Sequence, residues 1–419
     1  MKNVQYWFSF KKSWPAGYLL LAGFSQWAAA DSLTLAQTLA LLEQNNPALA
    51  SAKAAQEGAE AGLITARQYP NPDIEIAGGL STGLGDGALS GSNEAAFVSQ
   101  ALDLPFVREA RRQVAEAGIS SAEQANRQVW LLVQAQTQQA FYEILRRKAQ
   151  LQVSIDNEKL LQQIRDRVVL KVEVGESARY EAIKAEAELL NAVKLRNSAL
   201  VEVQDAKSAL RALFADAIPY DFDADGALPP ALLQLPELSS LRDNVLDQQP
   251  ALQQIRAEVQ KAQAKVELEQ TLRYPVPTLK AGVQQDPGLK QWQVGISLPL
   301  PLWNQRQGEI AEATAALKQS QADARQLELK IVRELENAYN RYQNADRQVR
   351  TFEQGLLEQA ESALQVAEAA YRLGARGILD YLDAQRTYRS VRNDYLNAQF
   401  DRQNALIDLE KLNGSTIKG

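Results

Sequence analysis

The C-terminal part of the chain carries apolar residues at helical spacing over a long, unbroken stretch. After Gly374 and Gly377, no glycine or proline occurs before Gly414. The apolar positions follow one another at steps of three and four, with Arg402 as the only polar residue in the register. These positions are Tyr381, Ala384, Tyr388, Val391, Tyr395, Ala398, Ala405, Leu409 and Leu412. Such spacing predicts a coiled-coil seam, so we expect a long helix packed along a neighbour.

Two other stretches are too long for the helices of a compact domain. Residues 107–174 and 304–373 contain no proline. If continuous, each would be about 100 Å long, roughly three times the thickness of a bilayer core. The segment 189–214 keeps the same register with Arg196 and Lys207 interrupting it. Polar residues weaken a dry seam but suit helices that line a wet interior. The pattern therefore predicts long helical hairpins.

Period-two alternation marks four shorter segments. Apolar and acidic residues alternate at 72–80, and a second run at 95–104 follows a loop at 81–92 that is rich in glycine and serine. Two later runs, at 279–283 and 292–298, flank an Asp-Pro-Gly turn. Each predicted strand has the length of a tilted strand in a membrane barrel. A lone hairpin is marginal in water, so we expect these hairpins to be completed by other chains.

The same series of elements occurs twice along the chain. The motif N-P-A-L at residue 46 returns as Q-P-A-L at residue 249, and a Tyr-Pro pair at residue 69 returns at residue 274. Self-similarity of this kind indicates an internal repeat. We expect a first repeat at residues 31–216 and a second at residues 237–419, each with a helix, a β-hairpin and a long helical hairpin. Residues 217–236, rich in proline and aspartate, form the predicted linker.

The first 30 residues differ from the rest. Three lysines precede an apolar run at 16–24, and three alanines end at Ala30. This pattern is typical of a secretory signal, and we favour cleavage after Ala30. A membrane anchor is the alternative, but it needs about 20 apolar residues.

Composition excludes several classes of function. The net charge of −6 argues against a nucleic-acid partner. Cysteine and histidine are absent, and the chain has a single methionine. These absences exclude a thiolate nucleophile and any soft or imidazole metal site. No glycine-rich phosphate loop follows a strand. We therefore expect no enzyme activity, no cofactor and no bound metal.

Two motifs carry a resemblance to a known family. The duplicated plan and the motif Y-x-x-G-x-x-x-x-x-D-x-L-D-A-Q, which begins at Tyr371, resemble the TolC family of outer-membrane efflux channels. The stretch S-L-P-L-P-L-W-N-Q-R-Q-G-E-I-A at 297–311 is similar to the heavy-metal branch, the CzcC-like and CusC-like proteins. The resemblance implies an α+β fold that is mainly α and built from two internal repeats. Three chains would each give four strands to one shared β-barrel, above a long coiled-coil α-helical barrel.

The resemblance also implies roles for individual residues. Asp380 and Asp383 match the aspartates at the periplasmic aperture of the family, so a trimer would carry a ring of carboxylates there. Tyr371 and Arg376 match positions whose contacts hold the aperture closed, and Glu181 stands where an acidic partner is expected. The two hairpin tips match the surface that meets a periplasmic adaptor. The tip residues are Val174, Gly175, Glu176, Leu373, Gly374 and Ala375.

The function implied is that of a passive trans-periplasmic conduit in a tripartite, RND-type efflux system. The partners implied are two further copies of the chain, a periplasmic adaptor (membrane fusion) protein, an inner-membrane pump and outer-membrane lipid. The expected cargo is a divalent heavy-metal cation: cobalt, zinc, cadmium or copper. Two alternatives stay open: the same channel serving drugs, other organic compounds or type I secretion, and a periplasmic coiled-coil adaptor or scaffold. Such an adaptor would have one hairpin flanked by compact β domains.

Overall fold

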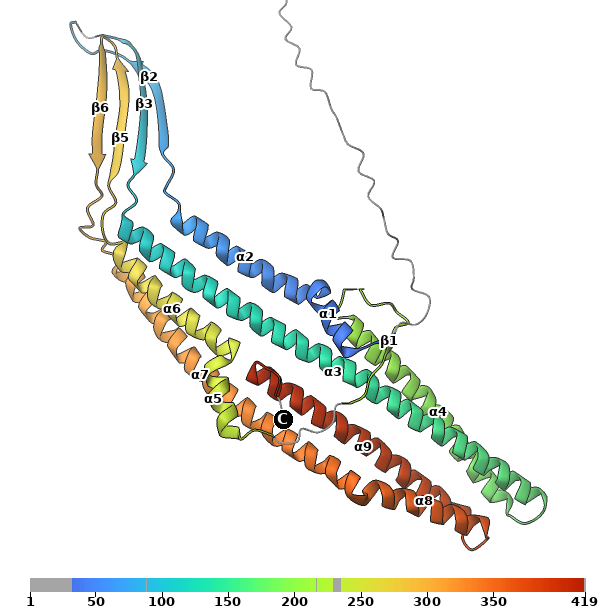
Figure 1. The fold of residues 1–419 in the computed structure, drawn as a ribbon. Helices are drawn as coiled ribbons and strands as arrows, with labels where there is room; N and C mark the ends of the chain where they lie inside the picture. The colour runs from blue at the N-terminus through green and yellow to red at the C-terminus, as the bar shows by residue number, and fades with distance from the viewer. Residues whose placement is uncertain (1–31, 88, 216, 229–234, 418–419) are drawn as a thin grey trace, which may run out of the picture.

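The computed structural model describes residues 32–87, 89–215, 217–228 and 235–417. The molecule is elongated, with one small sheet at one end and long helices leading away from it (Figure 1). The signal segment expected at 1–30 lies outside the described residues. The helices are α1 (Leu35–Asn45), α2 (Pro47–Arg67), α3 (Pro105–Glu173), α4 (Arg179–Arg211), α5 (Leu238–Gln248), α6 (Pro250–Thr271), α7 (Gln307–Thr351), α8 (Leu357–Arg372) and α9 (Ile378–Asn413).

The strands form one short pair and one larger sheet. They are β1 (Ser32–Leu33), β2 (Asp73–Ser81), β3 (Gly91–Ala101), β4 (Asp223–Ala224), β5 (Thr278–Asp286) and β6 (Leu289–Ser297). Each half of the chain runs through two helices, two strands, a long helix and a returning helix. β1 pairs with β4 in parallel, so part of the predicted linker is tied to the start of the first half.

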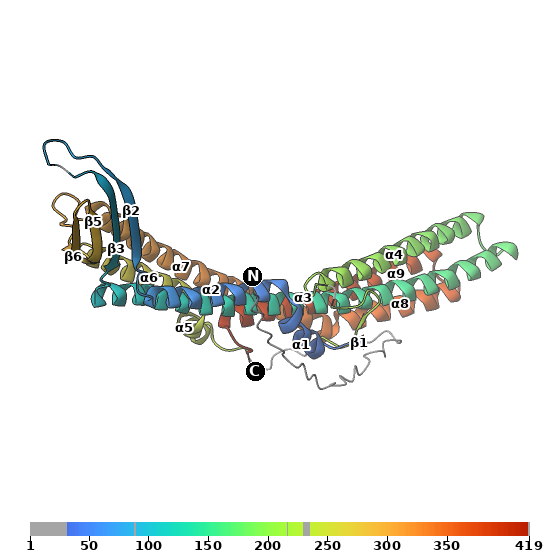
Figure 2. The same ribbon diagram turned by 90° about the horizontal axis from the view of Figure 1, so that it is seen from above.

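Helix α3 runs through most of the length of the molecule. It has 69 residues, which corresponds to about 100 Å, and this confirms the long helix predicted there. It begins at Pro105, where a missing amide proton costs nothing in the first turn of a helix. α3 packs against α2 and α6 near the sheet and against α4 and α9 further away (Figures 1 and 2). The other helices are thereby held around it.

The long helix expected across residues 304–373 is not continuous. A π-helical segment, Phe352–Leu356, separates α7 from α8, and inside it Gly355 has φ +148° and ψ −20°. Side chains rarely tolerate such a conformation, which glycine adopts freely. The absence of proline in this stretch did not indicate the break, because a single glycine within a helical pattern is a weak signal.

The two β-hairpins join into one antiparallel sheet. The strand order is β2-β3-β5-β6, with β3 and β5 paired in the middle. Each hairpin is therefore completed first by the other hairpin of the same chain, a pairing that the sequence pattern did not predict. β2 and β6 remain edge strands in the described part of the chain. Long unpaired edges invite further strands, so the expectation of other chains now applies to these two edges.

The one polar residue in the predicted α9 seam is buried and paired. Arg402 Nη1 lies 3.6 Å from Asp346 Oδ1 on α7, and the two side chains are only 10% and 13% exposed. Asp346 has a second cation, because Arg350 Nε donates to its Oδ2 at 2.8 Å. Removing one member of a buried pair leaves the other charge uncompensated.

This arrangement predicts unequal effects of two substitutions. Asp346→Ala is expected to lower the free energy of unfolding by about 3–5 kcal/mol, because Arg402 then stays buried without its counter-charge. Arg402→Leu should cost less, because Arg350 still compensates Asp346. Chemical denaturation of the purified variants measures both. Equal losses would show that the Asp346–Arg350 contact does not compensate the buried carboxylate.

Candidate functional site

The two helical hairpins end in tips with the same backbone geometry. Gly175, between α3 and α4, has φ +79°, and Gly374, between α8 and α9, has φ +71°. In each tip the amide after the glycine donates to the carbonyl five positions earlier, at 2.8 Å in the first tip and 2.9 Å in the second. Both tips lie at the end opposite the sheet (Figures 1 and 2). Both positions have a left-handed backbone, which explains why each is a glycine.

The residues that flank the tip glycines are accessible. Val174 is 62% exposed and Leu373 is 85% exposed. Glu176 and Ala375 are exposed as well. An apolar side chain thus stands free at the apex of each hairpin. All four positions are open to a partner protein.

The two predicted aperture aspartates lie on the first turns of α9. Asp380 is in the first turn, where a negative charge is favoured by the helix dipole. Its Oδ2 lies 3.7 Å from Arg376 Nη1 across one turn of the chain, and both side chains are more than half exposed. Asp383 is exposed one turn further on. Neither carboxylate is buried in the hairpin, so both are accessible at the tip.

Tyr371 is buried, but its hydroxyl has no partner within the chain. The ring stacks on Tyr381 with centroids 5.9 Å apart, and Lys171 Nζ lies 4.8 Å from the ring centroid. The hydroxyl oxygen is enclosed, and the described residues provide no hydrogen bond for it. Burial raises the pKa of Tyr371, and the nearby carboxylate of Glu181 raises it further. An enclosed hydroxyl without a partner is costly, which makes this a position that needs an explanation.

The structure brings only part of the predicted latch together. Glu181, in the first turn of α4, is near enough for its charge to act on Tyr371. Arg376 instead pairs with Asp380. Burial raises the pKa of Tyr381 to about 12, so this neighbouring hydroxyl stays protonated. A latch that includes Arg376 and Glu181 is therefore not assembled within one chain.

The two faces of the four-stranded sheet differ in chemistry. One face carries exposed apolar side chains: Ile76 is 81%, Trp292 82% and Val294 86% exposed. The opposite face carries Glu75 and Lys280 among other polar residues. A contiguous apolar surface of this kind is unusual on a protein that is entirely surrounded by water.

Neither a helical membrane span nor a metal cluster is found in the described ranges. No helix there combines the length and the apolarity needed to cross a membrane. The same residues contain no group of three or more acidic, histidine or cysteine side chains placed to hold a metal ion.

The sequence also matches the model of a known protein family. The model described as outer membrane efflux protein matches residues 38–215 and 241–415. The chain belongs to the outer membrane efflux protein family. The resemblance found in the sequence is thereby confirmed, and so are the location in the outer membrane and the efflux role at the level of this family.

Relatives of this efflux protein include metal-resistance and channel proteins. The cobalt-zinc-cadmium resistance protein CzcC of Cupriavidus metallidurans is 27% identical over 92% of this chain and 91% of that protein. The crystal structure of CusC matches with a TM-score of 0.78 and 20% identity, over 91% of this chain and 92% of CusC. The CmeC outer membrane channel of Campylobacter jejuni matches with a TM-score of 0.79 and 17% identity, over 92% and 86%. These structures confirm the TolC-like fold.

The sequence patterns did not predict a buried polar pair that lies between α3 and α9 of this efflux protein. Gln385 on α9 donates to Asn157 on α3, and the two residues are 4% and 5% exposed. Polar side chains inside a coiled-coil seam fix its register at a cost in stability. The only signal in the sequence is the glutamine of the D-A-Q motif, whose partner lies 228 positions away.

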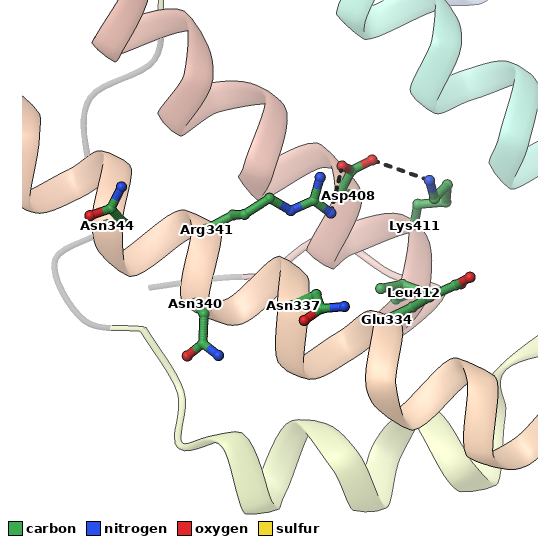
Figure 3. A pocket seen from close by; sticks show the side chains of 8 residues that line it. All are labelled: Glu334, Asn337, Asn340, Arg341, Asn344, Asp408, Lys411 and Leu412. Carbon is green, nitrogen blue, oxygen red and sulfur yellow. Dashed lines mark hydrogen bonds and ion pairs between the residues drawn. The ribbon is translucent and has the colours of Figure 1, made fainter.

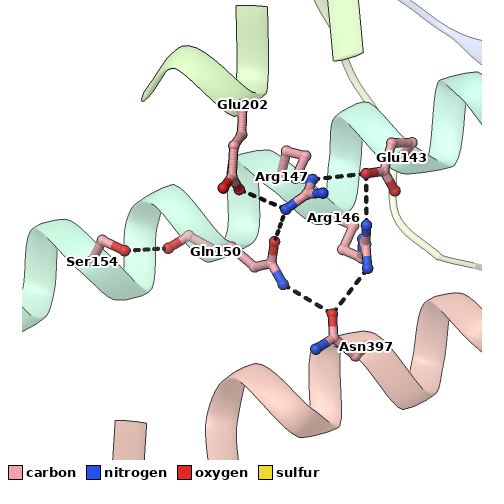
Figure 4. Close-up of polar contacts among 7 residues, drawn as sticks. All are labelled: Glu143, Arg146, Arg147, Gln150, Ser154, Glu202 and Asn397. Atoms are coloured by element: carbon pink, nitrogen blue, oxygen red, sulfur yellow. Dashed lines mark hydrogen bonds and ion pairs between the residues drawn. The ribbon is translucent and has the colours of Figure 1, made fainter. Parts of the chain in front are cut away.

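A second polar layer crosses the middle of the helices (Figure 4). Glu143 accepts hydrogen bonds from Arg146 at 2.6 Å and Arg147 at 2.7 Å. Arg147 reaches Glu202 on α4 at 2.5 Å, and Arg146 reaches Asn397 on α9 at 3.0 Å. This layer ties α3 to both neighbours and explains why charged residues recur within long helices that still pack.

A polar groove lies between α7 and α9 (Figure 3). It encloses about 760 Å³ and is lined in part by Asn337, Asn340 and Asn344. At its side Asp408 lies 3.4 Å from Arg341 and 3.1 Å from Lys411. Because these charges are already paired, the groove offers no free cluster for a cation.

Proposed function

We propose that this efflux protein is the outer-membrane channel of a tripartite efflux system and that three copies form one passive conduit. The apolar face of the sheet supports this assignment, because it would contact lipid. The free edges of β2 and β6 allow three sheets to close into one barrel, which would leave no edge unpaired. The polar face would then line the opening.

The helices would form the part of the conduit that crosses the periplasm. α3 alone has 69 residues, and a helix of that length measures about 100 Å. Polar layers such as Glu143 with Arg146 suit helices that face water on one side. At the far end, the exposed tips around Gly175 and Gly374 would meet the periplasmic adaptor, which in turn contacts an RND-type inner-membrane pump. The efflux protein itself carries out no chemistry in this proposal.

We propose divalent heavy-metal cations as the cargo. The observation that carries this step is the similarity to CzcC along 92% of the chain, since that relative is a cobalt-zinc-cadmium resistance protein. The exposed carboxylates of Asp380 and Asp383 agree with it, because a ring of six would attract cations. Weak attraction is sufficient, because a conduit must also release what it binds.

Growth of a deletion strain tests the cargo. We expect the strain to be sensitive to cobalt, zinc or cadmium and to recover when the gene is supplied in trans. The measurement is growth across graded metal concentrations and across a panel of organic toxicants. Sensitivity to organic compounds alone would contradict the metal assignment and favour drug efflux through the same channel.

Fractionation of cells distinguishes the proposed channel from the alternative, a periplasmic scaffold. The channel should be recovered as a trimer from the outer membrane after detergent extraction. A soluble periplasmic monomer would contradict the proposal and favour the scaffold, although the two hairpins of this chain, each with its own β-ribbon, argue against that class.

A further inference from the structure

The polar face of the four-stranded sheet is the less exposed one along the central strand β3. Along β3, the side chains on the face of Phe97 are half-buried and those on the opposite face are exposed, in strict alternation through Val98. The exposed apolar residues Ile76 and Trp292 lie on the opposite face by the strand register.

Three charged residues lie in adjacent rows on the polar face, near the helical end of the sheet. Asp73, Ser99 and Lys280 share one row across β2, β3 and β5. Glu75 lies in the next row, in register with Phe97. Two carboxylates and one ammonium group thus stand together, and their sum is one negative charge per copy.

Lys280 makes two contacts on this face. Its Nζ lies 2.8 Å from Glu75 Oε2 and 4.3 Å from the centroid of the Phe97 ring. A cation over an aromatic face is attracted by the ring electrons, so the ring and the carboxylate both attract the ammonium group. Both members of the ion pair are partly exposed, at 43% and 64% of the side chain.

A glycine makes this arrangement possible. Phe97 lies over Gly282 on β5, where an added Cβ would come within 2.4 Å of the ring and 2.3 Å of the Ala96 carbonyl oxygen. The ring therefore lies flat against the sheet, in the space that a side chain at residue 282 would occupy. Phe97 is the only aromatic residue on this face of β3, and it serves as the support of Lys280.

We infer that Lys280 places a positive charge on the wall of the pore and thereby sets the ion selectivity of the pore at the level of the sheet. This inference rests on the proposed function, in which the polar face lines the opening. Lys280 forms an ion pair with the carboxylate of Glu75, which a divalent cation in the pore would otherwise bind. Because exposed ion pairs are weak, Glu75 still exchanges partners, and the wall attracts cations without trapping them.

Planar-bilayer recordings of the full-length protein test this inference. In a KCl gradient, Lys280→Gln is expected to shift the reversal potential toward greater cation selectivity, and Glu75→Gln is expected to shift it the other way. Added Zn²⁺ should block Lys280→Gln at concentrations about tenfold lower than wild type, because Glu75 is then free to bind it. The double variant should lie near wild type.

Lys290→Gln is the matched control. It removes the same charge from the same sheet, but Lys290 is in register with Gln285, whose partner Glu94 pairs with Gly78 on the apolar face. We expect its reversal potential and zinc block to equal those of wild type. Pores with the same selectivity in all three single variants would overturn the inference and leave the proposed channel standing. Failure of the wild-type protein to form pores would overturn the proposed function, and the inference with it.

Discussion

Replacement of both Asp380 and Asp383 with asparagine is expected to weaken the block of the channel by divalent cations at least about a hundredfold. Three copies of the proposed trimer would place six carboxylates at the aperture. Even in bulk water, two unit charges about 4 Å apart attract by about 1 kcal/mol, so a divalent cation among six carboxylates gains several kcal/mol. Each 1.4 kcal/mol corresponds to about a factor of ten in affinity. Single-channel recordings with Co²⁺ or Zn²⁺ on the tip side measure the block.

The chain offers a matched control for this experiment. Glu57 and Glu60 on α2 have the same spacing of three and are exposed, but they lie in the half of the molecule near the sheet. Glutamine at both removes as many charges per trimer without touching the tips. An equal loss of block in this control, or unchanged block after replacement of Asp380 and Asp383, would contradict the aperture assignment.

The helices and the hairpin tips could be predicted from local patterns in the sequence. The three-and-four spacing of α9 depends only on which residues must face a neighbour, so the predicted seam includes the buried Tyr381 and Leu409. The tip glycines were equally readable, because a tight helical turn needs the left-handed backbone that Gly175 and Gly374 adopt. Strand limits were predicted to within a few residues, because alternation between two chemically different faces is visible in sequence.

Contacts between distant segments were not readable. β3 and β5 pair across a separation that no local pattern encodes. The same is true of the Asn157–Gln385 pair and of the Phe97 ring over Gly282. The break at Gly355 was missed for a different reason, since one glycine within a helical pattern is compatible with a continuous helix. The family resemblance supplied the aperture and latch residues, and their roles stay predictions.

Phenylalanine at Tyr371 combined with glutamate at Arg376 is expected to raise the single-channel conductance about tenfold or more. Within one chain the Tyr371 hydroxyl has no partner, so its removal should leave the free energy of unfolding unchanged or slightly increased. An effect of losing this hydroxyl on conductance would then come from a contact made with another chain, whereas Arg376→Glu also removes the pair with Asp380 within the chain. Hydrogen bonds to charged groups contribute about 1.5–3 kcal/mol each, and loss of one such contact is enough to shift a closed state tenfold toward an open one.

The first hairpin supplies the control for the latch. Tyr180→Phe with Arg179→Glu makes the same chemical change at exposed residues beside the other tip and should leave conductance unaltered. Thermal unfolding of both double variants separates damage to the fold from opening of the pore. If Tyr371→Phe with Arg376→Glu conducts as wild type does, the latch is absent, and the buried hydroxyl of Tyr371 is only a tolerated cost of the Tyr371–Tyr381 stack. If conductance rises in the double variant while stability is unchanged, the latch is present, and a rise in Tyr371→Phe alone would place the partner of the hydroxyl across the interface between chains.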